Sequence, residues 1–167
     1  MTITVETGAG LSNAVSYVST ADADAYWAAE ADVTWSGYPT AEREAALVRA
    51  TREIDRLYST RFIGIRTSLT QALAWPRSSA TTSDGLEIVA SVPIQVKTAV
   101  IELARSAAAG DLRLVSDPAD VSSETIKVGP IEISTDYAAR KASAYDRIAL
   151  LLAPVTRGAS AVRVHRT

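Results

Sequence analysis

PIQVKTAVIELARSAAA, Pro93 to Ala109, predicts one long helix. Proline suits the first turn of a helix, where its missing N–H costs no hydrogen bond, and Gly110 is a helix-stop residue. The apolar arc covers more than half of the circumference and consists of Ile94, Val96, Ala99, Val100, Ile101, Leu103, Ala104, Ala107 and Ala108. A surface helix needs only one apolar stripe, so we expect this helix to be packed on at least two sides and to be the hub of the fold. Its narrow polar arc, with Gln95, Glu102 and Arg105, is left for solvent or a neighbouring subunit.

Two further amphipathic helices are predicted to cover the hub helix. Thr40 caps the first, from about Ala41 to Tyr58, and the second runs from about Ala138 or Ala142 to Ala153, before Pro154. The apolar stripe of the first consists of Leu47, Ala50, Ile54, Leu57 and Tyr58. The apolar side of the second consists of Tyr145, Ile148, Leu151 and Leu152. These two stripes are the expected partners of the hub within the chain.

The N-terminal part of the chain predicts one shorter helix among loops. Ser19 or Thr20 caps a helix from about Ala21 to Ala31, and Asp22 and Asp24 suit its positive end. Ile3 to Val5 alternates with Thr and predicts a short strand. Residues 35–39 and 59–92 are rich in turn residues, and we expect both to be irregular.

A β-hairpin is the best-specified local structure of the sequence. Gly129-Pro130 suits a two-residue type II′ turn between residues 123–128 and 131–134. This register pairs Val128 with Ile131 and Ile126 with Ile133 on one face. It pairs Lys127 with Glu132 on the other face, so packing and charge agree. An isolated hairpin is marginal in water, so this one should lie on the domain or on a neighbour.

The fold class that follows is mainly α: a small bundle of about four helices with one β-hairpin and an extended C-terminal arm. We place the helical domain at residues 1–154 and the arm at 155–167.

The chain has 167 residues, is 47% hydrophobic and carries a net charge of −2, which argues against a dedicated nucleic-acid binder. It has no Cys, which excludes disulfides and Cys-ligated zinc. No signal peptide or membrane span is expected, because the N-terminus lacks a basic start and no window is long and apolar enough.

The charges are unevenly distributed along the chain. Residues 1–42 contain six acidic residues and no Lys or Arg, whereas residues 43–77 contain seven Arg. Ordinary solvated faces explain this pattern; the alternative is that an acidic edge of one subunit meets a basic edge of the next. Two interpretations are also open for the basic row formed by Arg49, Arg52 and Arg56. These residues are either a solvated face, with a pair such as Arg49 with Glu53, or a contact to a subunit or to DNA.

No catalytic, metal or cofactor constellation is found in the sequence, and we expect no enzyme activity. The only His, His165, lies two residues from the C-terminus, which is a poor position for a catalytic triad. Asp22 and Asp24 fit the start of a helix better than a metal site, and the GAG stretch is too short for a phosphate loop.

A single-strand DNA groove would combine aromatic and basic residues, and one segment matches this faintly. The residues are Tyr58, Arg61, Phe62, Arg66, Trp75 and Arg77. The simpler interpretation places these aromatic residues in the core.

Taken together, several stretches resemble a family of tailed-bacteriophage proteins encoded among head and tail genes. They are ETGAGLSNAVSYVSTADADAYW, AALVRATREIDRLY, QALAWPR, VPIQVKTAVIELA and VGPIEI, within about residues 3 to 153. The family is that of head–tail connector (adaptor) proteins, also labelled DnaT-like single-strand DNA-binding proteins.

The first label implies a dodecameric ring beneath the portal, in the neck of the virion after assembly in the host cytoplasm. The ring extends the DNA channel, without sequence-specific DNA binding, and docks the stopper or tail. The second label implies a replication accessory protein that binds single-stranded DNA.

The connector resemblance implies partner surfaces rather than an active site. We expect the arm to reach the portal through Arg157, Val162, Arg163, Val164, His165 and Arg166. We expect contacts with the next subunit or the stopper at Lys127, Gly129, Pro130, Glu132, Arg49, Arg52 and Arg56, and in the loop 78–90.

Overall fold

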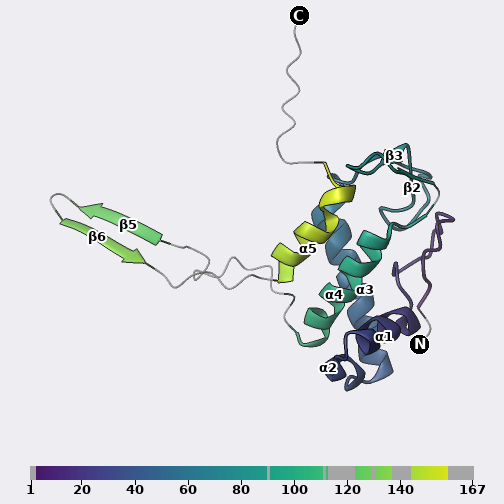
Figure 1. The fold of residues 1–167 in the computed structure, drawn as a ribbon, viewed down its shortest axis with the longest axis horizontal. Helices are drawn as coiled ribbons and strands as arrows, with labels where there is room; N and C mark the ends of the chain where they lie inside the picture. The colour runs from purple at the N-terminus through teal and green to yellow at the C-terminus, as the bar shows by residue number, and fades with distance from the viewer. Residues whose placement is uncertain are drawn as a thin grey trace, which may run out of the picture.

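Helix α4 (Ile94–Ala108) is the hub of the computed structural model, and it packs against α3 (Thr40–Tyr58) and α5 (Ala144–Leu152) (Figure 1). The structure describes residues 3–89, 91–110, 112, 123–128, 131–136 and 144–157, with residues 123–128, 131–136 and 144 described by their backbone alone. Within these ranges the fold is mainly helical, with five α-helices and three two-stranded antiparallel sheets. The predicted fold class is confirmed, while the arm beyond residue 157 lies outside the described residues.

The hub helix is buried along most of its predicted apolar arc. Its buried side chains are Val96, Ala99, Val100, Ile101, Leu103, Ala104 and Ala107. Pro93 occupies the N-cap position, and Gly110 follows the helix with a φ of 85°. Ile94 differs from the prediction, because it is 68% exposed in the first turn of the helix.

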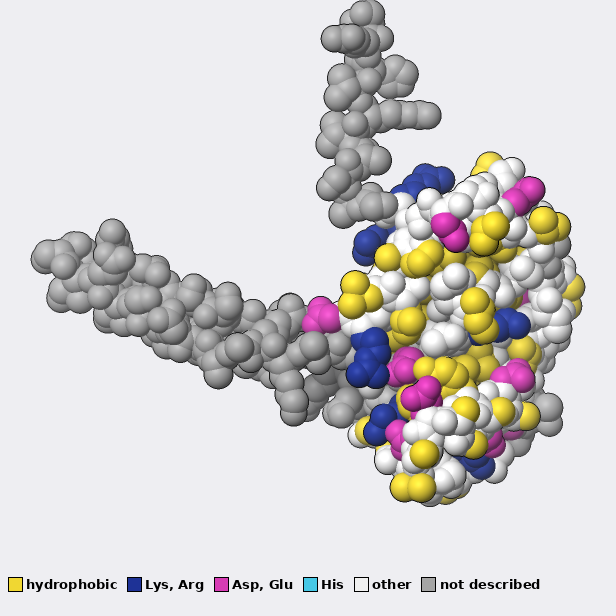
Figure 2. Space-filling view, in the orientation of Figure 1, with side chains coloured by type: hydrophobic (Ala, Val, Ile, Leu, Met, Phe, Trp, Pro, Cys, Tyr) yellow, Lys and Arg dark blue, Asp and Glu magenta, His cyan; other side chains and the backbone are white. Residues whose placement is uncertain are grey.

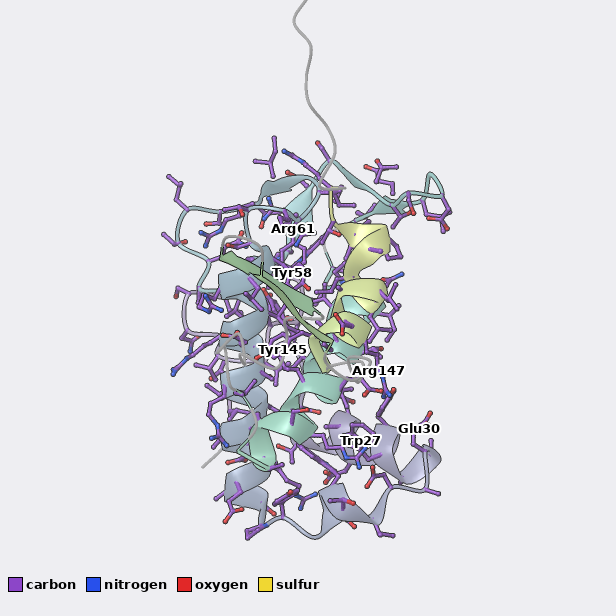
Figure 3. The ribbon with its side chains drawn as sticks, turned by 90° about the vertical axis from the view of Figure 1, so that its left-hand side faces the viewer. Trp27, Glu30, Tyr58, Arg61, Tyr145 and Arg147 are labelled. Atoms are coloured by element: carbon purple, nitrogen blue, oxygen red, sulfur yellow. The ribbon has the colours of Figure 1, made fainter. Side chains whose placement is uncertain are left out.

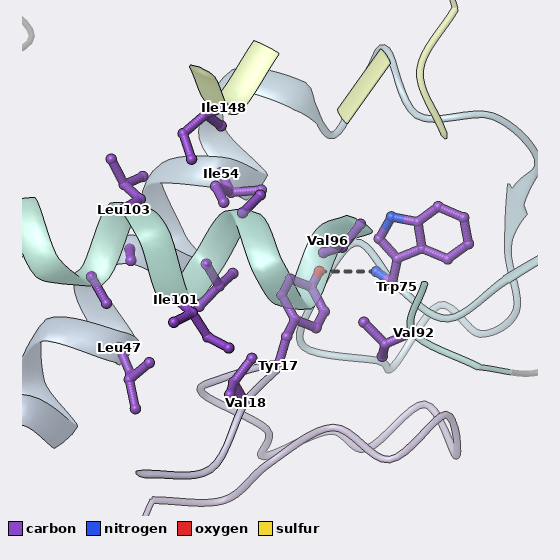
Figure 4. Packing of buried hydrophobic residues seen from close by; sticks show 14 of the residues in the cluster. Tyr17, Val18, Leu47, Ile54, Trp75, Val92, Val96, Ile101, Leu103 and Ile148 are labelled. Carbon is purple, nitrogen blue, oxygen red and sulfur yellow. Dashed lines mark hydrogen bonds between the residues drawn. The ribbon is translucent and has the colours of Figure 1, made fainter. Parts of the chain in front are cut away.

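The two predicted partner stripes cover the hub. Leu47, Ala50, Ile54 and Tyr58 are buried on α3, and Ile148 and Leu152 are buried on α5. Figure 4 shows Ile54, Leu103 and Ile148, from the three helices, in one packed layer. Each such aliphatic side chain contributes about 1.5–3 kcal/mol on burial, so this layer is the main source of stability.

Helix α1 (Thr20–Ala29) and the N-cap residue of α2 (Val33–Ser36) contact two residues of the polar arc of the hub, which was predicted to face solvent or a neighbouring subunit. The Tyr26 hydroxyl donates to Glu102 Oε1 at 2.8 Å. Burial and this hydrogen bond raise the pKa of Tyr26 to about 12. Arg105 pairs with Asp32 at 2.8 Å, and its guanidinium lies 5.3 Å from the ring centroid of Trp27. Long-range partners of this kind cannot be found from helical periodicity.

The starts of the helices show two differences from the sequence-based expectations. Ser19 caps α1 as predicted, because its side chain accepts from the Asp22 N–H. Helix α2 falls in a segment predicted to be irregular; Asp32 caps it, and the helix turn places Trp35 in the core. Helix α3 begins at Thr40 itself, with Pro39 at the N-cap and no side-chain hydrogen bond there, so the predicted Thr40 cap is wrong.

The segment 59–92 contains two small sheets where irregular structure was predicted. Strand β1 (Ile65–Arg66) pairs with β2 (Arg77–Ser78), and β3 (Ala80–Thr81) pairs with β4 (Glu87–Ile88). Two-residue strands are too short to give an alternating pattern in the sequence. At the N-terminus the predicted strand is reduced to one bridge between Val5 and Ser16.

The predicted hairpin is confirmed in both its strands and its register. Strand β5 (Ser123–Val128) pairs with β6 (Ile131–Asp136), with Val128 opposite Ile131, Lys127 opposite Glu132 and Ile126 opposite Ile133. In Figure 1 the two strands stand away from the helices, so none of the described helices lies beside them. The turn residues 129 and 130 lie outside the described ranges.

The helical body continues beyond α5 to Arg157. A 3₁₀ turn (Ala153–Val155) follows the helix, and Val155 is fully buried. The Ile63 N–H donates to Val155 O at 3.1 Å, and the Arg157 N–H donates to Arg61 O at 2.7 Å. Residues 155–157, which the sequence placed in the arm, therefore pack on the body.

One buried hydroxyl joins three distant segments of the body. The Tyr17 hydroxyl donates to Asp55 Oδ1 at 2.7 Å and accepts from the Trp75 N–H at 3.0 Å (Figure 4). The other carboxylate oxygen of Asp55 accepts from the Ala74 N–H at 2.9 Å. Burial raises the pKa of Tyr17 and of Asp55, which shows that both groups lie in a poorly solvated environment.

We expect Tyr17→Phe to lower the free energy of unfolding by about 1–3 kcal/mol, because the buried Trp75 N–H then has no acceptor. Urea unfolding of the purified chain measures this change. Tyr38→Phe is the matched control, since Tyr38 is only half-buried, and it should change stability by less than about 0.5 kcal/mol. Equal effects of the two substitutions would contradict the assigned role of Tyr17.

We also expect Asp55 to impose a pH dependence on stability. Its pKa is raised above 3.8 in the folded chain, so just above this pH the folded state binds more protons than the unfolded state. The free energy of unfolding should therefore fall as the pH rises from 3.8 through the pKa of the folded state. Asp55→Asn should remove this slope, as measured by urea unfolding at a series of pH values. An unchanged slope would show that Asp55 does not titrate in this way.

Candidate functional site

The hairpin presents an apolar row and a charged row at alternate positions. Because side chains alternate along a strand, positions 126, 128, 131 and 133 share one face, and Lys127 and Glu132 share the other. The predicted contact residues Gly129 and Pro130 lie outside the described residues. The same is true of Val162, Arg163, Val164, His165 and Arg166 of the arm.

The arginine row of α3 is exposed, but its three members differ. Arg56 forms two hydrogen bonds with the Glu53 carboxylate, at 2.9 and 3.0 Å, and these bonds raise the pKa of Arg56. The sequence suggested the pair of Arg49 with Glu53, whereas the structure pairs Glu53 with Arg56. Arg49 and Arg52 therefore remain the members of this row that a partner could use.

The aromatic residues of the faint DNA-binding pattern are in the core. Phe62 and Trp75 are fully buried, with ring centroids 5.7 Å apart in an edge-to-face contact. Tyr58 is 6% exposed, and the Arg61 guanidinium lies 5.2 Å from its ring centroid (Figure 3). Bases of single-stranded DNA stack on exposed rings, so these three rings do not form a stacking platform.

The arginines of the same pattern, Arg61, Arg66 and Arg77, lie together with Arg157 at one end of the body, which we call the arginine end. The backbone hydrogen bond between Arg157 and Arg61 brings these two exposed residues together. Burial, and then the charges of Arg157 and Arg66, lower the pKa of Arg77. Figure 2 shows dark blue side chains at this end, where the chain leaves the body. The sequence did not predict that Arg157 joins Arg61, because 95 residues separate them along the chain.

Arg77 has a structural role within this arginine end. Its guanidinium donates to Ile63 O at 2.7 Å, Gly64 O at 3.0 Å and Ala74 O at 3.3 Å. Gln71 of the same motif donates to Leu73 O and Pro76 O. The QALAWPR motif therefore holds the loop segment together, and Arg61, Arg66 and Arg157 are its exposed basic neighbours.

A pocket of about 450 Å³ lies between α1 and α2. Its apolar walls include Trp27, Ala28, Val33 and Trp35, and its polar groups include those of Arg43. The Trp35 Nε1–H donates to Asp24 at 2.7 Å, but Trp27 Nε1 and Arg43 Nε are buried without a hydrogen-bond partner. No pattern in the sequence predicted this pocket, because the pocket depends on the unpredicted helix α2.

Metal-binding clusters and membrane-spanning helices are both absent from the described ranges. No group of three or more His, Cys, Asp or Glu residues there could hold a metal ion. No helix in those ranges has the length and apolar character needed to cross a membrane.

The comparisons with known proteins assign the family. A family model described as "Putative DnaT-like ssDNA binding protein" matches residues 1–167. The chain belongs to this family. The description agrees with the second label of the resemblance, single-strand DNA binding, and does not mention a connector. No curated protein and no solved structure matches the chain.

We expect Arg77→Lys to lower the free energy of unfolding by about 1–3 kcal/mol, because an ammonium group cannot donate to all three carbonyl oxygens in this geometry. Arg61→Lys, at an exposed position, should change it by less than about 0.5 kcal/mol. Thermal unfolding of the two variants measures the difference. If Arg77→Lys were as stable as the unchanged chain, the structural role of Arg77 would be wrong.

Proposed function

We propose that this chain is an assembly protein, the connector subunit of a tailed-bacteriophage neck. The observation that carries this proposal is the β5–β6 hairpin, which stands away from the described helices (Figure 1). A lone two-stranded hairpin is marginally stable in water, and its edges offer unpaired N–H and C=O groups. A neighbouring subunit that covers the hairpin would stabilise it and would pair the N–H and C=O groups of its edges.

The buried aromatic residues support assembly over single-strand DNA binding. Phe62 and Trp75 stabilise the core and are not accessible to bases. The net charge of −2 also gives little general attraction to phosphate groups. A channel that lets DNA pass needs neither stacking nor strong charge attraction.

The proposed ring assigns roles to the remaining predicted surfaces. The subunits form a dodecamer beneath the portal and dock the stopper or tail. Arg49 and Arg52 contact the acidic N-terminal edge of a neighbour, and the arm reaches the portal. Because Arg157 is hydrogen-bonded to the body, a truncation that removes only the arm should begin at residue 158.

Single-strand DNA binding is the second candidate function. The family description names it, and the arginine end provides the observation that favours it. Arg61, Arg66 and Arg157 are exposed there. No ion pair with a carboxylate in the described ranges is present for Arg61 or Arg157.

The proposal is tested by assembly of hairpin variants on the portal protein of the same phage. The double variant Ile126→Ser, Ile133→Ser removes the paired apolar side chains from one face of the hairpin. We expect it to lose ring formation on the portal, as measured by native mass spectrometry, while its urea unfolding is unchanged. The matched control Thr125→Ala, Ser134→Ala changes a cross-strand pair on the other face and should assemble normally. Normal assembly of both variants, or of neither, would contradict the role given to the apolar face.

Binding of a labelled oligonucleotide across a salt series tests the second candidate. We expect no salt-sensitive binding at micromolar protein concentrations. If binding is found, Arg61→Glu, Arg157→Glu is compared with Arg49→Glu, Arg52→Glu, which reverses the same number of charges on α3. Loss of binding in the first variant alone would support DNA binding at the arginine end and overturn the connector proposal.

A further inference from the structure

The segment that builds the arginine end also exposes aliphatic side chains. Phe62 and Trp75 of this segment are fully buried. Of the seven large hydrophobic side chains that are exposed in the described ranges, four lie between residues 65 and 89: Ile65, Leu69, Leu86 and Val89. A single exposed aliphatic residue is ordinary, but several of them beside arginines have the composition of a protein-binding surface.

Backbone hydrogen bonds join the parts of the arginine end. The Arg157 N–H donates to Arg61 O at 2.7 Å, and the Ser83 N–H donates to Pro154 O at 3.3 Å. The second bond places the turn between β3 and β4 beside the 3₁₀ turn that follows α5. Figure 1 shows the C-terminal end of α5 at the same end of the body as β2 and β3. The loops of this end are therefore tied to one another rather than separate.

Leu69 is fully exposed at the tip of a loop that side-chain hydrogen bonds hold in place. Gln71 Oε1 accepts from the Ser68 N–H and from the Thr67 hydroxyl, both at 2.9 Å. The Arg66 guanidinium donates to the backbone oxygen of Gln71. A loop that is already fixed loses little conformational entropy on binding, so an apolar side chain at its tip suits a pocket of a partner.

The exposed arginines around this loop lack carboxylate partners. Within the described ranges, none of Arg61, Arg66 and Arg157 forms an ion pair. Burial, and then the charges of Arg157 and Arg66, lower the pKa of Arg77, so both charges lie close to that residue. Positive charges that are close together and unpaired attract a surface that carries carboxylates.

Two acidic residues lie in the segment 59–92, and they do not neutralise these arginines. Asp84 follows β3, and Glu87 lies in β4. Both are exposed, and neither forms an ion pair in the part of the chain that the structure describes. The basic side of the arginine end is therefore available to a partner.

A protein partner fits this surface better than a nucleic acid does. Single-stranded DNA stacks on exposed rings, whereas an aliphatic side chain adds nothing to a phosphate contact. Arg157, the last described residue before the arm, lies in the arginine end. A partner that binds the arm is therefore placed beside the same surface.

We infer that the arginine end is a docking surface for a protein that presents carboxylates around an apolar pocket. Leu69 enters the pocket, and Arg61, Arg66 and Arg157 contact the carboxylates. This inference rests on the proposed function, in which the arm reaches the portal, and it makes the portal the partner. The body then shares the portal contact with the arm, and the portal surface that meets it is acidic.

Binding of the full-length chain to the purified portal protein of the same phage, measured by surface plasmon resonance, tests this surface. Leu69→Ser should weaken binding by about tenfold to a hundredfold, because it removes the side chain that is buried in the complex. Leu150→Ser, at a position 76% exposed on α5, is the matched control and should bind as the unchanged chain does. Equal binding of the two variants would overturn the inference.

The charges are tested by the double variant Arg61→Glu, Arg157→Glu. We expect it to bind the portal at least about tenfold more weakly than the unchanged chain, because carboxylates then face carboxylates. Binding of the unchanged chain should also weaken as salt is added, since salt screens the attraction between exposed charges. Unchanged binding of the double variant, or binding that salt does not affect, would overturn the inference.

A labelled oligonucleotide in place of the portal tests the nucleic-acid alternative. A phosphate contact requires the arginines but not Leu69. Oligonucleotide binding that is lost in the double variant and kept in Leu69→Ser would assign the arginine end to phosphate groups and overturn the inference.

The portal experiment also separates this inference from the proposed function. If the unchanged chain binds the portal and the variants bind it equally well, the docking surface is wrong and the connector proposal stands. If the unchanged chain does not bind the portal at all, the connector proposal is wrong, and the partner assigned to the arginine end is wrong with it.

Discussion

The arrangement of the loops on the helical body depends on the two hydrogen bonds of the Tyr17 hydroxyl. This hydroxyl joins a loop before α1, the Asp55 carboxylate on α3 and the backbone N–H of Trp75, three segments that are far apart in the sequence. Because the site is poorly solvated, each of these hydrogen bonds is costly to leave unmade. The apolar layer of α3, α4 and α5 supplies most of the stability, and the Tyr17 junction fixes how the loop segments sit on that layer.

The motifs most specific to the family resemblance are structural in this chain. In the N-terminal stretch the buried Glu6 carboxylate accepts from the N–H groups of Gly8, Gly10 and Leu11 at 2.8–3.0 Å. This loop also binds the QALAWPR segment, since the Ala72 N–H donates to Leu11 O. Such motifs identify the family because they build a shared body. They do not locate a functional site, and this is why function has to be argued from the hairpin, the pocket and the arginine end.

The sequence predicted the features that depend on local patterns. Helical periodicity identified α3, α4 and their buried stripes, and the Gly129-Pro130 turn signal identified the hairpin register. Features that depend on distant partners were missed or misplaced. Helix α2 is short and needs Trp35 in the core, and Glu102 faces Tyr26 of α1 rather than solvent. The pocket follows from these contacts, so no local pattern could have predicted it.

We infer a helical body that is stable on its own and a hairpin that requires a neighbour. Hydrogen–deuterium exchange of the full-length chain, alone and assembled on the portal, tests this separation most directly. We expect the Trp75 amide to exchange slowly in both states. Amides of residues 123–128 and 131–136 should exchange fast in the free chain and become protected on assembly. Hairpin amides that are equally protected in the free chain, or that remain fast in the assembled ring, would contradict the account.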